Sequence, residues 1–144
     1  MRFCTAMLIL TLLFTAAIAT PAAARNAAGL AFDVNGFYPM FLHSPADGWT
    51  IGMEAYPSLS YIGIIGRMYE KSDLSGRFGG VVLGTTSKKS PPPPGLSVLR
   101  LQGGYAFRIE RNGRGLVGLT YDTYSAPNYS SAALGVLVEV HYVW

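Results

Sequence analysis

Apolar and polar residues alternate through the last twelve positions, residues 133–144, which read ALGVLVEVHYVW. One set of alternate positions is entirely apolar: Leu134, Val136, Val138, Val140, Tyr142 and Trp144. The other set is mixed and includes Glu139 and His141. A period of two is typical of a β-strand with one apolar and one wetter face, and β-branched and aromatic residues suit such a surface. This segment therefore predicts a strand.

Similar segments run through the chain from residue 30 onward. We expect strands at residues 30–42, 49–55, 59–70, 77–86, 97–109, 115–124 and 133–144. Loops are expected at residues 43–48 (HSPADG), 71–76 and 125–131 (SAPNYSS), with turns at 56–58 and at Asn112-Gly113. Residues 87–95 (SKKSPPPPG) cannot pair in a sheet because proline lacks the N–H donor, so they predict an exposed connection. No helical stripe is found after residue 24.

The final strand resembles the last strand of the outer-membrane β-barrels of Gram-negative bacteria. The resemblance rests on the terminal Trp144, on Tyr142 two positions earlier, and on Val138 and Val140 before them. In that family the assembly machinery of the outer membrane recognises this strand. The resemblance implies these four residues as an assembly signal, and outer-membrane lipid and lipopolysaccharide as surroundings. The alternative is the last core strand of a soluble β-sandwich or barrel.

Residues 1–24 have the layout of a secretory signal peptide. Arg2 is followed by an apolar run over residues 6–18 and by a small-residue segment that ends with Ala22, Ala23 and Ala24. The apolar run is shorter than the roughly 20 residues of a membrane-spanning helix. We expect cleavage after Ala24, which leaves residues 25–144 as one barrel domain. Cys4 is the only cysteine, so cleavage would remove disulfides, cysteine-ligated metal and thiol catalysis from the function classes.

Composition favours a chain that faces lipid. Hydrophobic residues make up 50% and charged residues 13%, against about a quarter charged in ordinary globular proteins. Without Arg2, ten basic residues face eight acidic ones, and no basic cluster exceeds Lys88-Lys89, so nothing predicts a nucleic-acid partner. About 120 residues cannot enclose a large core.

The alternating faces predict which side of the barrel is polar. Aliphatic side chains and bracketing aromatics such as Tyr105 and Tyr121 share one face, as the lipid-facing wall of a membrane barrel would require. The opposite face holds glycine, alanine and the charges, and small residues are what a narrow lumen can hold. We therefore predict a charge network in the lumen that pins the strand register, made of Asp33, Glu54, Arg100, Arg108, Asp122, Glu139 and His141.

The strand count needs a correction, because the segments number seven and single-chain bacterial barrels have even numbers of strands. Dividing residues 30–42 at Asn35-Gly36 gives eight strands, and placing that segment outside the barrel gives six. We predict an all-β fold, a small antiparallel up-and-down transmembrane β-barrel of eight strands. With the C-terminus in the periplasm, the Asn112-Gly113 turn would be periplasmic and the proline loop external.

Candidate chemistry is sparse. The family includes lipid A deacylases and palmitoyltransferases, and the deacylases use a histidine, a serine two residues later and a downstream glutamate. The matching stretch here, residues 121–128, reads YDTYSAPN and has no histidine. Glu139 and His141 share a face and suggest an acid–base pair, but no nucleophile on the same wall is identifiable, and no spacing indicates a metal or cofactor site.

Three functions stay open at this point. The first is a barrel without a pore, with a structural role or interactions through its loops, since eight strands leave an interior that side chains fill. The second is a lipid A-modifying enzyme of the deacylase kind. The third is a soluble, lipocalin-like barrel that binds a small apolar ligand.

Overall fold

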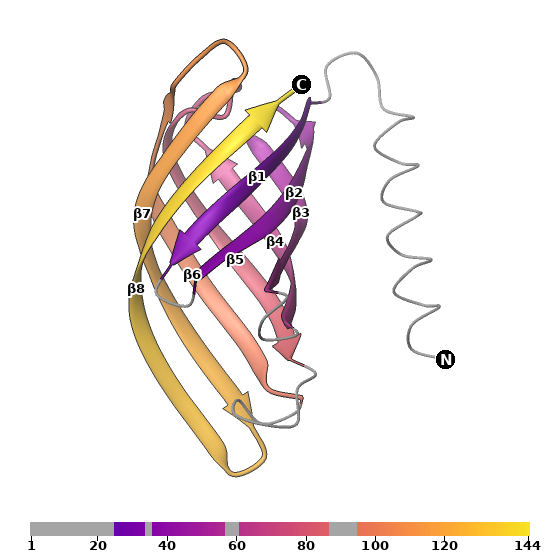
Figure 1. Ribbon diagram of the computed structural model, residues 1–144, viewed down its shortest axis with the longest axis vertical. Helices are drawn as coiled ribbons and strands as arrows, with labels where there is room; N and C mark the ends of the chain where they lie inside the picture. Colours follow the sequence, from indigo (N-terminus) through magenta and orange to yellow (C-terminus); the bar gives the residue numbers. More distant parts are fainter. Residues whose placement is uncertain (1–24, 34–35, 57–60, 87–94) are drawn as a thin grey trace, which may run out of the picture.

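A computed structural model describes residues 25–33, 36–56, 61–86 and 95–144, which form one closed antiparallel up-and-down β-barrel of eight strands (Figure 1). The strands are β1 (Arg25–Asp33), β2 (Gly36–Ala46), β3 (Trp49–Tyr56), β4 (Tyr61–Tyr69), β5 (Gly76–Thr86), β6 (Ser97–Arg108), β7 (Gly113–Ala126) and β8 (Tyr129–Val143). The predicted all-β barrel and its eight strands are confirmed. Residues 1–24, 34–35, 57–60 and 87–94 lie outside the described residues, so the signal peptide, the turn expected at residues 56–58 and the proline connection stay predictions. No helix in the described part of the chain is long and apolar enough to cross a membrane.

The first predicted segment does divide near Asn35, but both halves are longer than residues 30–42 allow. β1 begins at Arg25, and β2 continues to Ala46, so the predicted loop at residues 43–48 is wrong. Pro45 is tolerated because the pairing of β2 with β3 shifts between His43 and Ala46, at a bulge. Only Asp47 and Gly48 connect β2 to β3.

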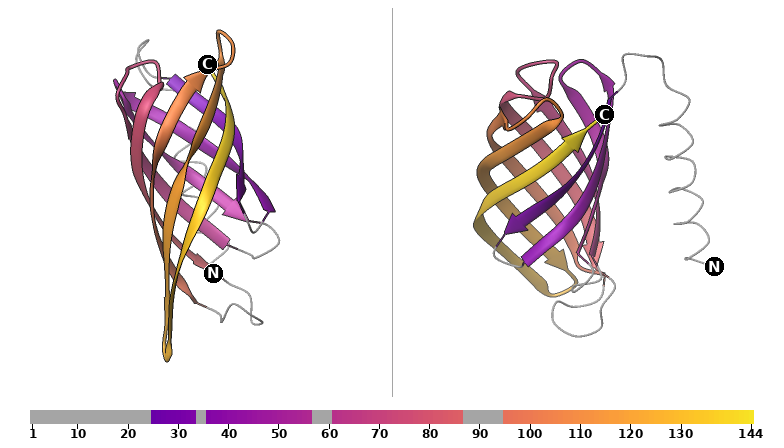
Figure 2. Two further views of the ribbon diagram at one scale, coloured as in Figure 1. Left: turned by 90° about the vertical axis from the view of Figure 1, so that its left-hand side faces the viewer. Right: turned by 45° about the horizontal axis from the view of Figure 1, so that its top comes forward.

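The predicted loop at residues 125–131 is also wrong. β7 and β8 stay paired to Ala126 and Tyr129, and the turn consists of Pro127 and Asn128. Asn128 has a φ of 64°, a left-handed conformation that asparagine tolerates better than most residues. The result is a hairpin that projects beyond the rest of the barrel wall (Figures 1 and 2).

β8 is longer than its neighbour on the other side of the seam. Its pairing with β7 extends from Tyr129 to Tyr142, but its pairing with β1 covers only Val138 to Val143. Beyond Val143 the seam continues, because Asn26 and Trp144 exchange backbone hydrogen bonds of 2.9 Å in both directions. Arg25 and Trp144 therefore lie at one end of the barrel, here called the terminal end, while the β7–β8 turn lies at the other (Figure 1).

The apolar side chains point away from the barrel axis. Leu101, Val117 and Val138 are 51%, 46% and 42% exposed, so they do not form a central core. Every strand contributes to the 25 exposed large hydrophobic side chains found among the described residues. The predicted orientation, apolar outside and charged inside, is confirmed for these strands, although inward apolar residues such as Tyr38, Ile65 and Leu137 also fill the interior.

Candidate functional site: the charged interior of the barrel

Buried polar side chains occupy the inward positions of most strands. Within the described residues they include Thr50, Glu54, Arg67, Arg100, Gln102, Arg114, Thr120, Asp122, Glu139 and His141. Inward and outward residues alternate along each strand, so a charged residue at an inward position has no route to solvent through the wall. A charge in such a place needs a partner of opposite sign. Two arginines organise these partners.

Arg67 of β4 is the centre of the first cluster. Its Nη1 and Nη2 atoms donate to both carboxylate oxygens of Glu139 on β8, with Nη1 to Oε2 at 2.5 Å. Nη2 also donates to Oε1 of Gln102 on β6, at 3.0 Å. The side chains of Arg67 and Glu139 have no exposed surface. This bidentate pair crosses the lumen and so joins β4 and β8, which are not neighbours in the sheet.

Arg100 of β6 is the centre of the second cluster. Its Nε and Nη2 atoms donate to the two oxygens of Asp122, at 2.7 and 3.0 Å, and Asp122 is its register partner on β7. Nη1 donates across the lumen to the hydroxyl of Tyr38 at 3.0 Å and to Oε1 of Glu54 at 3.3 Å. The Tyr61 hydroxyl donates to the same Glu54 oxygen at 3.2 Å. These contacts connect five strands through one guanidinium group and its ligands.

His141 extends the first cluster toward the terminal end. Its Nε2 lies 2.8 Å from Oε2 of Glu139, although its orientation does not satisfy hydrogen-bond geometry. Both residues are buried, at 3% and 1% exposed. Because both oxygens of Glu139 already accept from Arg67, the carboxylate is held as a counterion and is not a free base. The acid–base pair suggested by the sequence therefore has its acid engaged by a third residue.

Glycines make room for these large side chains. A Cβ at Gly80 would lie 2.7 Å from Cγ of Arg67 and equally close to the backbone oxygen of Gly66. A Cβ at Gly29 would collide with the His141 ring, which approaches that strand closely. Gly80 and Gly29 are thus part of the site, since a side chain at either position would take the space of Arg67 or of His141.

The predicted network is only partly in the lumen. Glu54, Arg100, Asp122, Glu139 and His141 lie inside and contact one another through the two clusters. The placement of Arg108 in that network is a wrong prediction, because its side chain is 58% exposed at the terminal end and pairs with Asp73 at 3.0 Å. The cause is its position as the last residue of β6, where the inward direction leads to the barrel mouth. The side chain of Asp33 lies outside the described residues.

Sequence reasoning missed Arg67 and its neutral partner Gln102. The signal was present in residues 61–69, where Arg67 shares its parity with Tyr61, Ile65 and Tyr69, all of them buried. Isoleucine and methionine at the intervening positions are exposed, but isoleucine also occurs on the inner face. The two faces of this strand therefore do not differ clearly in polarity. A single arginine in the middle of an otherwise uncharged strand was the useful clue.

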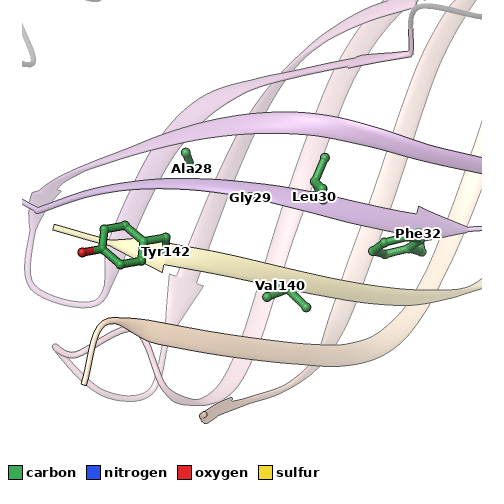
Figure 3. A pocket seen from close by; sticks show the side chains of 6 residues that line it. All are labelled: Ala28, Gly29, Leu30, Phe32, Val140 and Tyr142. Atoms are coloured by element: carbon green, nitrogen blue, oxygen red, sulfur yellow. The ribbon is translucent and has the colours of Figure 1, made fainter. Parts of the chain in front are cut away.

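The residues predicted as an assembly signal form the outer surface of the seam. Val138, Val140, Tyr142 and Trp144 are all between 42% and 59% exposed. Tyr142 and Trp144 stack with ring centroids 6.1 Å apart, and Phe41 lies 6.2 Å from Trp144. Beside them, a shallow apolar groove of about 450 Å³ crosses the seam between β1 and β8, lined by Ala28, Gly29, Leu30, Phe32, Val140 and Tyr142 (Figure 3).

Comparisons with protein-family models, curated proteins and solved structures found no match to this chain. Among the described residues, no group of three or more histidine, cysteine, aspartate or glutamate side chains could hold a metal ion. The function must therefore be argued from the barrel itself.

Proposed function

We propose that this chain is a small outer-membrane β-barrel protein of Gram-negative bacteria, exported by a signal peptide, with a structural role or interactions through the parts that project beyond its wall. The observation that carries the proposal is the inverted polarity of the barrel. All eight strands direct large apolar side chains outward, while arginine, glutamate and aspartate lie in the interior beside inward apolar residues. In a soluble barrel of this size the interior is the apolar side.

The outer surface has the distribution that a bilayer requires. The outward positions of the described strands hold a single charged side chain, Arg77, at the second residue of β5 near the terminal end. Aromatic residues such as Trp49, Tyr105 and Tyr142 lie toward the terminal end, and aliphatic residues follow along the same strands. Aromatic girdles at the interface and aliphatic side chains between them are typical of transmembrane barrels.

The closed sheet supports the same proposal. Hydrocarbon offers no hydrogen-bond partners, so a sheet can span it only when each strand pairs on both sides. The seam between β1 and β8 meets this condition from Ala27–Val143 to Phe32–Val138, and the Asn26–Trp144 bonds extend it. Residues 129–137 of β8 have only β7 as a neighbour among the described residues, whereas β7 stays paired with β6 as far as Ser125. We therefore place the tip of the β7–β8 hairpin outside the bilayer, where it is available to other molecules.

The interior favours a structural role over conduction. Arg67 and Arg100 each cross the lumen and bind acidic residues on the far wall. Buried ion pairs of this kind fix the register of the strands, and their side chains occupy the space that an ion or solute would need to pass through the barrel. The partners implied are outer-membrane lipid, lipopolysaccharide and the barrel-assembly machinery. No cofactor is needed for this function.

Cell fractionation with gel electrophoresis tests the proposal. The full-length chain should be recovered in the outer membrane and should migrate faster before boiling than after it, as a folded barrel resists detergent. Recovery as a folded protein in the soluble periplasm would contradict the proposal and favour a lipocalin-like binder. A change in lipid A acylation, measured by mass spectrometry between cells with and without the gene, would instead support the enzyme alternative.

A further inference from the structure

A second charged region, separate from the lumen clusters, lies at the terminal end of the barrel. A hollow of about 330 Å³ opens there, lined by Arg25, Asp73, Arg108, Arg111, Asn112, Arg114, Val143 and Trp144. We call it the arginine pocket. Four separate parts of the chain meet in it: the start of β1, the β4–β5 turn that carries Asp73, the β6–β7 turn with its flanking residues, and the end of β8.

The side chains of the arginine pocket are strongly unbalanced in charge. Four arginines face one aspartate, which leaves an excess of three positive charges among the lining side chains. Asp73 already binds both Arg108, at 3.0 Å, and Arg114, at 3.7 Å. The Ser75 hydroxyl donates to Asp73 at 2.5 Å and, together with the guanidinium groups of Arg114 and Arg108, holds the pKa of the carboxyl below its usual value. Asp73 is thus ionised and shared.

Backbone carbonyls hold the arginines in place without neutralising them. Arg114 is 4% exposed in its side chain and donates to the carbonyl oxygens of Asp73, at 2.9 Å, and of Glu110, Arg111 and Gly113. Arg25 donates to the carbonyl of Ser72 at 3.2 Å. A carbonyl satisfies an N–H group but supplies no net charge, so the positive potential of the pocket stays. The guanidinium groups of Arg25 and Arg114 are therefore held in place at the pocket before any anion binds.

We propose that the arginine pocket binds a phosphate-class oxyanion, either a free phosphate or the phosphate of an anionic lipid headgroup. A phosphate group would offset part of the three excess charges, one charge for a phosphodiester headgroup and up to two for free phosphate near neutral pH. Arginines can donate to its oxygens in the paired geometry that guanidinium groups favour. The mouth position of the pocket leaves Arg108 58% exposed and able to reach such a group. This inference does not depend on the proposed membrane location, since the pocket follows from the barrel end alone.

Isothermal titration with inorganic phosphate tests the proposal, on protein expressed from the full chain and purified in a zwitterionic detergent. We expect saturable binding of phosphate that acetate does not reproduce. The double variant Arg25→Gln/Arg108→Gln should bind on the order of tenfold more weakly or worse, because it removes two charged donors. Arg77→Gln is the matched control: Arg77 lies at the same end of the barrel but does not line the pocket, so its loss should leave binding unchanged.

A lipid arm distinguishes the two sources of phosphate. Short-chain phosphatidylglycerol that binds in competition with phosphate, while phosphatidylcholine does not, assigns the pocket to a headgroup; binding of phosphate alone assigns it to a soluble ligand. Both results support an oxyanion site. Absence of saturable binding in both arms would overturn the proposal, as would equal loss in the Arg77→Gln control. The unboiled gel migration of each variant confirms that the barrel is folded.

Discussion

Removing the carboxylate of Glu139 is the perturbation that the interior predicts most sharply. Glu139→Gln keeps the size of the side chain but leaves Arg67 charged, with no exposed surface and without its bidentate partner. Breaking a buried pair from one side costs about 3–5 kcal/mol, because the remaining charge is unpaired in a poorly polarisable interior. His141 loses its acidic neighbour in the same variant.

The size of the effect can be measured by urea unfolding in detergent micelles, followed by tryptophan fluorescence and by gel migration. With a denaturant dependence of about 2 kcal/mol per molar urea, a loss of 3–5 kcal/mol lowers the midpoint by about 1.5–2.5 M. Arg108→Gln is the matched control: its pair with Asp73 is at the exposed end, so its loss should cost at most about 1 kcal/mol.

A double variant separates pairing from packing. Arg67→Met/Glu139→Met removes both charges together, and we expect it to unfold at higher urea than either Arg67→Met or Glu139→Met, because no uncompensated charge remains. The reasoning is refuted if Glu139→Gln shifts stability by no more than the Arg108→Gln control. It is refuted equally if the double variant is less stable than both single variants.

Three further predictions concern the wall, the hairpin and the barrel mouth. Gly80→Ala should lower stability by about 1–3 kcal/mol in the same urea assay, because its Cβ would lie 2.7 Å from Arg67, whereas Gly79→Ala, with its nearest described atom at 4.0 Å, should be tolerated. Leu119→Arg, on the outer wall, should destabilise the barrel in liposomes by about 2–4 kcal/mol, and Tyr129→Arg, at the projecting end of β8, should not; equal effects of the two would contradict a lipid-facing wall. Asp73→Asn should lower stability at neutral pH, and the difference from the parent protein should disappear on acidification. The reason is that folding lowers the pKa of Asp73 below the unfolded-state value near 3.8. The contribution of Asp73 to stability is therefore present above that value and is lost as the pH falls through the folded-state pKa. A pH-independent difference in unfolding midpoint would contradict that last assignment.

The strands with the clearest alternation, and the direction of their side chains, could be predicted from the sequence. Residues 97–109 and 133–144 each put apolar side chains at every second position, and the parity alone gives the exposed face. The loops were harder. Proline and glycine in residues 43–48 and 125–131 indicate turns, but in this barrel Pro45 lies at a bulge and Pro127 in a two-residue turn, so the strands continue on both sides.

The contacts across the lumen could not be predicted from the chain alone. Parity places Arg100 and Asp122 on the inner face, and they are register partners on adjacent strands. Arg67 on β4 and Glu139 on β8 have three strands between them on either side of the barrel, and their pairing depends on the tilt and stagger of the closed sheet, which alternation does not encode. The arginine pocket was missed for a related reason, since it gathers turns and strand ends that no single segment contains.

The most direct test of the account is to measure whether water or hydrocarbon surrounds Leu101, near the middle of β6. A spin label on Leu101→Cys, in a Cys4→Ser chain reconstituted in liposomes, reports collisions with oxygen, which concentrates in hydrocarbon, and with a nickel chelate, which stays in water. We predict frequent collisions with oxygen and few with nickel at Leu101, and the opposite at Tyr129→Cys on the projecting hairpin. Frequent nickel collisions at Leu101 in the folded protein would contradict the claim that the apolar wall faces lipid.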